Sequence, residues 1–212
     1  MNRVSVSAAT HPATRPAMCA ARPGLGLLAA CLVLVGCATH RAAPLAPLPW
    51  EERAAMLQHA SEWQLDGRTA VALNQQGWQA SLDWRQHGDT GEVHLAGPLG
   101  VGAVALTLTP GGVSVNGAPP SEAQSEQLDE RLGFSLPLAE LRYWLLGVPA
   151  PEETFDLKRN ADDRAASLTQ SGWSIDYDRY SAVAGDWLPA LLHLTRAGVR
   201  VKVAVDHWEL KR

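Results

Sequence analysis

The sequence predicts a mainly β domain with helices, built on one curved antiparallel sheet. Apolar and polar residues alternate in short runs between residues 65 and 115, and again between residues 168 and 210, with turn residues at regular intervals. This pattern is typical of strands that are joined by tight turns and have one apolar and one polar face. Helical spacing appears at residues 50–63 and between residues 121 and 147. Because a sheet of roughly ten strands usually curls, we expect it to close into a barrel or to leave a cavity.

The composition indicates a globular chain with an unusual supply of tryptophan. Hydrophobic residues make up 46% of the chain and charged residues 19%, and there are eight Trp against three Tyr and two Phe. Tryptophan suits half-buried positions and apolar pockets because it combines a large apolar area with one polar N–H. The formal net charge is −4 and there is no Arg-rich run, which argues against a nucleic-acid partner.

Residues 1–36 have the features of a secretory signal peptide. Three arginines and no acidic residue precede an apolar run, Leu25–Val35, that is too short to span a bilayer. The run ends in Leu34-Val35-Gly36-Cys37, which resembles the lipobox of bacterial lipoproteins, where the cysteine is lipidated and becomes the first mature residue. An ordinary signal peptide with an incidental cysteine is the alternative, and Met18 is a second candidate start. We expect residues 1–36 to be removed and Cys37 to be lipidated.

Removal of this segment changes the charge and the cysteine chemistry. It takes away three arginines and no acid, so the formal charge falls from −4 to −7. Cys19 and Cys31 are lost as well, and Cys37 alone then leaves no intramolecular disulfide and no cysteine metal site. Acyl chains on Cys37 would tether the protein to a membrane. Ala38 follows, where an aspartate tends to signal inner-membrane retention in lipoproteins, so by resemblance we expect the outer membrane.

A linker and one helix begin the mature chain. Residues 37–49 include Pro44, Pro47 and Pro49 and are expected to form an extended tether. In residues 50–63 apolar side chains recur on one helical face, which predicts an amphipathic helix. The folded domain is therefore expected to span residues 50–212.

Five strands are expected in the first β region. They cover residues 65–73, 78–85, 92–96, 104–108 and 113–115, and polar or Gly-containing turns separate them. Each strand has an apolar face that must be covered or must bind something.

The connection Gly97-Pro98-Leu99-Gly100 separates two of these strands. Proline suits the second position of a tight turn and glycine the fourth, so we predict a type I turn with Leu99 near its tip. Connections usually carry polar residues at the surface. Leu99 therefore either folds back onto the core, the commoner arrangement for a lone leucine, or faces something apolar outside.

Two further helices are expected between the β regions. Ser121 can cap a helix over residues 122–132, and Gly133 can end it. A second helix begins near Pro137 and carries Leu138, Leu141, Trp144 and Leu145 before Gly147. Because this helix is so apolar, it can pack on the open face of a curved sheet. β structure resumes near Leu168 and continues through residues 173–177, 192–194 and 199–210.

The sequence contains no motif for catalysis or metal binding. The six histidines after residue 36 form no His-x-x-x-His pair, and there is neither a Gly-x-Ser-x-Gly elbow nor a phosphate-binding glycine loop. The pairs Glu152-Glu153 and Asp162-Asp163 are expected to be solvated loop acids. We expect no catalytic residue, no metal and no cofactor. The tryptophans Trp84, Trp144 and Trp173 are each expected in the core or on a cavity wall, and together they favour a cavity.

Several of these features together resemble the LolB family of outer-membrane lipoprotein receptors. They are the lipobox, the helix from Trp50, the Pro98-Leu99-Gly100 loop, the helical segment from Leu136-Pro137-Leu138 to Leu141-Arg142-Tyr143-Trp144-Leu145-Leu146-Gly147, and the endings Trp173, Tyr177, Tyr180, Leu188-Pro189, Val201-Lys202-Val203 and Trp208. The resemblance covers nearly all of residues 34–210. Gly97 departs from the family, in which a polar residue is common at that position.

The resemblance implies an open half β-barrel around an apolar cavity, with helices covering its mouth. It also implies an outer-membrane lipoprotein, anchored by lipid and facing the periplasm, that accepts lipoproteins from the soluble carrier LolA and inserts them into the membrane. The loop leucine of the family, here Leu99, would serve membrane insertion, and the helix carrying Trp144 would move to admit acyl chains. We expect a monomer whose cavity wall includes Val71, Leu82, Trp84, Leu106, Leu141, Trp144, Leu145 and Trp173.

Two other classes of function remain open at this point. A structural or assembly lipoprotein could bind a protein partner on the apolar sheet face, and a cavity too small for acyl chains would favour it. A periplasmic hydrolase would need a cluster of carboxylates and histidine in a cleft, for which the sequence offers no motif.

Overall fold

The computed structural model describes residues 48–211 except 75 and 101. The predicted signal peptide, the predicted lipidation site Cys37 and nearly all of the predicted tether lie outside the described residues. Within the described part, no helix is long and apolar enough to cross a membrane.

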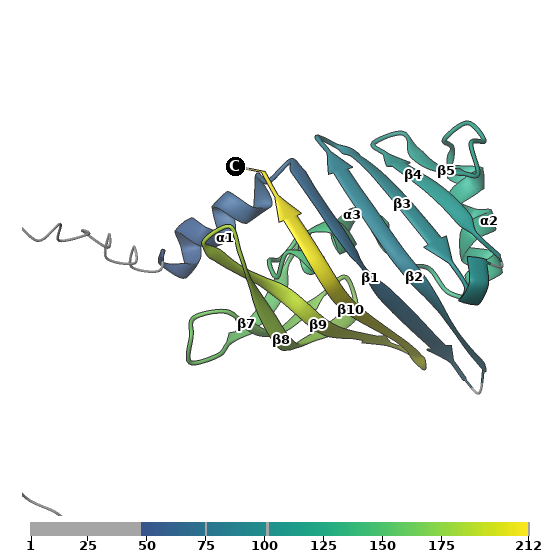
Figure 1. The fold of residues 1–212 in the computed structure, drawn as a ribbon. Helices are drawn as coiled ribbons and strands as arrows, with labels where there is room; N and C mark the ends of the chain where they lie inside the picture. Colours follow the sequence, from purple (N-terminus) through teal and green to yellow (C-terminus); the bar gives the residue numbers. More distant parts are fainter. Residues whose placement is uncertain (1–47, 75, 101, 212) are drawn as a thin grey trace, which may run out of the picture. The chain divides into compact units, whose positions relative to one another are not determined.

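Ten strands form one antiparallel sheet in the order β5-β4-β3-β2-β1-β10-β9-β8-β7-β6 (Figure 1). The first and last strands of this order, β5 and β6, do not pair, so the sheet curves without closing. β1 pairs with β10, which joins the two β regions of the chain. The strands are β1 Glu62–Leu73, β2 Gln76–His87, β3 Thr90–Ala96, β4 Val104–Thr109, β5 Gly112–Val115, β6 Phe155–Arg159, β7 Ala165–Gln170, β8 Trp173–Val183, β9 Asp186–Arg196 and β10 Val199–Leu210.

Three helices accompany the sheet: α1 Trp50–Gln58, α2 Glu122–Leu132 and α3 Leu138–Leu145. The predicted caps of α2 are confirmed, because the Ser121 hydroxyl accepts a hydrogen bond from the Gln124 N–H at 3.3 Å and Gly133 ends the helix at φ 77°. α2 lies beside β5, and α3 packs behind the sheet (Figure 1).

The first helix is shorter than predicted. It ends at Gln58, and Trp63, expected to be its last residue, lies in β1 opposite Leu210 of β10. The reason is tertiary packing. Trp63 is buried between Trp84 and Trp208, with ring centroids 5.7 and 5.6 Å apart, and only an extended backbone brings it there.

The strand β6 was not predicted from the sequence. It spans Phe155–Arg159, has three charged residues among its five, and four of its five side chains are exposed. Such charge is common on edge strands, where it discourages pairing with another chain. With only Phe155 and Leu157 as apolar residues, the run is too short and too charged to be recognised as a strand from the sequence.

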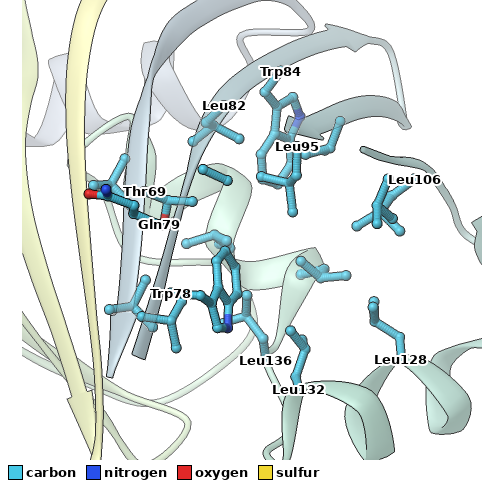
Figure 2. Close-up of a pocket in the computed structure, with 18 of the residues that line it drawn as sticks. Thr69, Trp78, Gln79, Leu82, Trp84, Leu95, Leu106, Leu128, Leu132 and Leu136 are labelled. Atoms are coloured by element: carbon cyan, nitrogen blue, oxygen red, sulfur yellow. The ribbon is translucent and has the colours of Figure 1, made fainter. Parts of the chain in front are cut away.

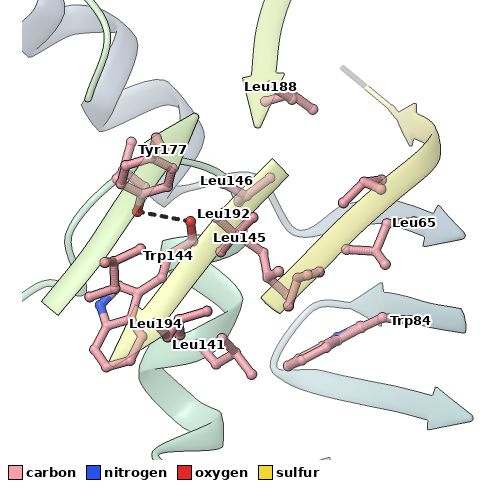
Figure 3. Close-up of a cluster of buried hydrophobic side chains, with 14 of the residues drawn as sticks. Leu65, Trp84, Leu141, Trp144, Leu145, Leu146, Tyr177, Leu188, Leu192 and Leu194 are labelled. Carbon is pink, nitrogen blue, oxygen red and sulfur yellow. Dashed lines mark hydrogen bonds between the residues drawn. The ribbon is translucent and has the colours of Figure 1, made fainter. Parts of the chain in front are cut away.

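The core lies between the inner face of the sheet and α3 (Figure 3). Leu192 and Leu194 of β9 and Leu65 of β1 are fully buried there, together with Leu145 and Leu146 at the end of α3. The Tyr177 hydroxyl donates a hydrogen bond to the Trp144 carbonyl at 3.0 Å and so ties α3 to β8. This core fills one side of the half-barrel and leaves the other side open.

Candidate functional site

An apolar cavity of about 460 Å³ occupies the open side of the half-barrel (Figure 2). Its floor is the inner face of β1–β5 and β10, and its cover is formed by α2, α3 and the segment between them. The only side chains of its wall with polar groups are Thr69, Gln79 and the indoles Trp78 and Trp84; the others are aliphatic or aromatic. A cavity of this size and character suits an apolar ligand.

Six residues expected on the cavity wall lie there: Val71, Leu82, Trp84, Leu106, Leu141 and Leu145. Figure 2 shows Trp84 beside Leu95 at the top of the view, and Leu106 comes from β4. Inward-facing positions of the strands supply the first four. α3 supplies the last two.

The expectation is wrong for Trp144 and Trp173, which are fully buried in the core and do not line the cavity. Trp144 turns away to donate its indole N–H to Gln170 Oε1 at 2.8 Å. Trp173 packs edge-on against Phe134, with ring centroids 6.2 Å apart. Phe134 stands on the cavity wall in its place, so Trp173 supports the wall from behind.

Much of the cavity's cover was not predicted from the sequence. Leu128 and Leu132 of α2, and Phe134, Leu136 and Leu138 that follow, all line the cavity. Leu128 and Leu132 are four residues apart on an otherwise polar helix, so they share one face. This spacing could have predicted that α2 turns that face towards the cavity. Trp78 at the β2 end of the cavity was assigned to a strand but not to the wall. It keeps 40% of its surface exposed, which places an indole at the rim.

The predicted loop adjoins this cavity. Gly97 and Pro98 line the cavity, while Leu99 next to them points away and is fully exposed, at 103% of its reference area. The turn is closed by a hydrogen bond from the Gly100 N–H to the Gly97 carbonyl at 2.9 Å. Leu99 is therefore at the tip and does not fold back.

The turn is not type I. Leu99 has φ 60° and ψ 22°, the left-handed conformation, whereas a type I turn has a negative φ at that position. For a leucine this conformation costs about 1–2 kcal/mol. A backbone that is strained to present a bare leucine to the surface is a frequent sign of function.

Titratable groups do not gather at the cavity. Among the described residues, no group of three or more His, Cys, Asp or Glu side chains could hold a metal ion. Burial raises the pKa of Tyr177 and Tyr180 well above the usual range, and the two hydroxyls donate to the carbonyls of Trp144 and Ala165. These tyrosines stay neutral and structural.

Comparison with known proteins decides the family. The family model described as "Outer membrane lipoprotein LolB" matches residues 61–208. The chain belongs to the LolB family. An outer-membrane lipoprotein LolB of Chromohalobacter salexigens is 32% identical over 206 residues, which cover 94% of this chain and 95% of the relative. One of Pseudomonas putida is 36% identical over 167 residues, covering 77% and 82%.

A solved structure supports the fold of this LolB family member. The LolA superfamily protein of Nitrosomonas europaea superposes with a TM-score of 0.50 at 9% sequence identity, covering 78% of this chain and 95% of that one. The curved, unclosed sheet with helices is therefore shared despite little sequence similarity. The half-barrel that the resemblance implied is confirmed.

Proposed function

We propose that this chain is an outer-membrane lipoprotein that receives lipoproteins from a LolA-like periplasmic carrier, holds their acyl chains in the cavity and inserts them into the outer membrane. The observation that carries the proposal is the apolar cavity with the fully exposed Leu99 at its edge. The cavity suits acyl chains in transit, and the exposed Leu99 suits contact with a bilayer. The relatives' name, outer-membrane lipoprotein LolB, supports both roles.

The cavity lowers the main barrier to moving an acylated protein through water. Each exposed CH₂ of an acyl chain costs about 0.8 kcal/mol, so a chain leaves a carrier only for another apolar environment. Transfer therefore proceeds downhill, from the carrier to this cavity and from the cavity to the bilayer. Such a transfer requires neither covalent chemistry nor an energy source. The sequence accordingly has no nucleotide-binding motif.

The contacts favour α2 as the part of the cover that opens, in place of the α3 movement expected from the sequence. α3 is held by the fully buried Trp144 and its bonds to Gln170 and Tyr177. The described side chains of α2 are at most half-buried, and Leu128 and Leu132 are its contacts with the cavity. Faster amide hydrogen exchange in α2 than in α3 is the expected result, and equal protection would contradict it.

The Leu99→Glu variant tests the proposal. A charged side chain at the tip cannot enter hydrocarbon, so delivery to liposomes should fail, while uptake of a lipidated protein from the carrier should continue. Phe155→Glu is the matched control, because Phe155 is also an exposed hydrophobic residue (52%) but lies on the edge strand β6. Normal delivery by Leu99→Glu would show that the loop has another role.

Uptake itself is tested with the chain carrying Cys37→Ala, which lacks the predicted lipid. It should take a lipidated protein from its carrier. A chain that takes up none would instead support the alternative of an assembly lipoprotein that binds a protein partner on its apolar sheet face.

A further inference from the structure

The outward face of the sheet is unevenly charged. The antiparallel order brings the turn after β1, the loop after β3 and the turn after β9 to one end of the sheet, which we call the Leu99 end (Figure 1). Near this end, the outward positions of β10, β1 and β2 carry Arg200, Lys202 and Arg68 as their only charged residues. The other six are Ala204, Ala70, Ala72, Gly77, Gln79 and Ser81.

Carboxylates begin only further along these strands. Asp66 lies opposite Asp83 of β2, and Asp206 lies close by on β10, all on the side away from the Leu99 end. The long segment from Val93 to Ser121, which contains the loop, has no acidic residue at all. In a chain with 22 acids and 18 Lys or Arg, this end of the sheet is therefore locally cationic.

The cations and the exposed leucine share one groove. A groove of about 820 Å³ has Arg68, Lys202 and small side chains of β1, β2 and β10 on one side, and the loop Gly97–Gly100 on the other. Leu99 belongs to its rim. An apolar side chain and two cations consequently face the same space from opposite walls.

The two cations are available for a partner. Lys202 has no ion-pair partner within the described residues. It lies opposite His193 of β9, and Asp176 lies opposite His193 on the next strand, β8. The Arg68 guanidinium donates to Asp206 Oδ1 at 2.9 Å, but the two side chains are 71% and 55% exposed. Such an exposed pair is weak and leaves the other N–H groups of Arg68 free.

We propose that this groove docks the anionic headgroups of membrane phospholipids, with Arg68 and Lys202 contacting their phosphates while Leu99 enters the hydrocarbon. The proposal rests on the proposed function in needing Leu99 to meet a bilayer. A leucine beside cations matches the layered chemistry of a bilayer surface, where hydrocarbon lies just below phosphate. The groove is open and could not surround a single anion on all sides. This shape disfavours a free phosphate as its occupant. Arginine pairs phosphate oxygens bidentately, and lysine adds a flexible point charge.

Vesicle binding by the full chain with Cys37→Ala tests this inference, because the predicted anchor no longer contributes. Vesicles of neutral phosphatidylcholine are compared with vesicles in which about a third of the lipid is anionic phosphatidylglycerol. The parent chain should bind the anionic vesicles more tightly, and salt should reduce the difference. The double variant R68Q/K202Q should weaken anionic binding about 25-fold and leave neutral binding unchanged, since each cation near a membrane contributes about fivefold.

A matched control separates this groove from general charge. R85Q/K158Q also removes one exposed arginine and one exposed lysine, but from positions outside the groove, and should keep the anionic preference. Equal binding of the parent to both vesicles, or equal losses in the two double variants, would overturn the inference. Uptake of a lipidated protein from the carrier is measured in parallel. If uptake fails, the proposed function fails, whereas a failure of the vesicle result alone removes only the headgroup site.

Discussion

Arg53 of α1 and Asp186 of β9 form an ion pair inside the domain, with 2.7 Å between Arg53 Nε and Asp186 Oδ1. The two side chains are only 8% and 9% exposed. Arg53 Nη2 also donates to the Trp187 carbonyl at 2.5 Å, and the Trp187 N–H donates to Asp186. α1 is thus fastened to the start of β9 by charge as well as by apolar contact.

Removing one partner of this pair should be far worse than removing both. Asp186→Ala leaves a buried guanidinium without its carboxylate and should lower the free energy of unfolding by about 3–5 kcal/mol. The double variant R53M/D186N should recover most of that loss. Urea denaturation measures both. Arg68→Gln, which breaks an exposed pair, should cost less than about 1 kcal/mol; a similar small cost for Asp186→Ala would contradict the prediction.

Gln170 should be a second point of sensitivity. Its buried amide accepts from the Trp144 indole and the Ala150 N–H, each at 2.8 Å, and donates to the Ala150 carbonyl at 2.9 Å. Gln170→Leu keeps the volume but leaves these three groups unpaired in the core. We expect a loss of about 3 kcal/mol or more in unfolding free energy, because each unsatisfied buried group costs about 1–3 kcal/mol. Retained stability would mean that water replaces the amide.

The stability of the fold should depend on pH through the carboxyl group of Asp83. Burial, and then the hydrogen-bonded Asp66 carboxyl opposite, raise the pKa of Asp83 above its usual value, against the opposing effect of Arg85. Because the folded-state pKa is above that of the unfolded chain, ionised Asp83 destabilises the fold at neutral pH, and protonation at low pH removes this effect. Asp83→Asn should therefore raise stability near about pH 7, and its advantage should shrink toward about pH 3. Thermal unfolding across this range measures it, with exposed Asp156→Asn as the control.

At Gly67 the backbones of β1 and β10 leave no room for a side chain. An added Cβ would lie 2.3 Å from the Ala204 carbonyl oxygen, at the point where the register of the two strands shifts. Gly67→Ala must therefore push the strands apart, and we expect a loss of about 2–3 kcal/mol. At Gly111 the nearest atom to an added Cβ is 3.8 Å away, so Gly111→Ala should change stability by less than about 0.5 kcal/mol. Chemical denaturation of the pair gives the comparison.

Much of this fold could be predicted because its signals are local. Alternation located most strands, and Ser121 and Gly133 marked the ends of α2 by the hydrogen bond and the left-handed φ that those residues favour. The strand boundary at Trp63 could not be found this way. The residue is fixed by contacts with Trp84 and Trp208, which are distant in the sequence.

The candidate site was harder to predict because a cavity wall and a packed core use the same residue types. Trp84 and Trp144 are both fully buried on the inner side of the sheet, yet only Trp84 borders the cavity. Periodicity reports which face is turned inward and not whether the space beyond is filled. The left-handed φ of Leu99 is a similar case, since the pattern Pro-Leu-Gly favours positive φ at glycine and not at leucine.

Filling the cavity should block acyl binding without unfolding the domain. Val104 of β4 is a half-buried wall residue, so a larger side chain there can extend into the empty space. Val104→Trp should weaken binding of a fluorescent fatty acid at least about tenfold and slow lipoprotein uptake equally, because it removes volume that the chains need. Thr107→Trp is the matched control, since Thr107 lies on the same strand but faces outward and is absent from the wall. Fluorescence titration compares the two variants, and circular dichroism checks that both remain folded. If Val104→Trp folds and binds the fatty acid as the control does, the chains are held elsewhere and the apolar cavity is not the transfer site.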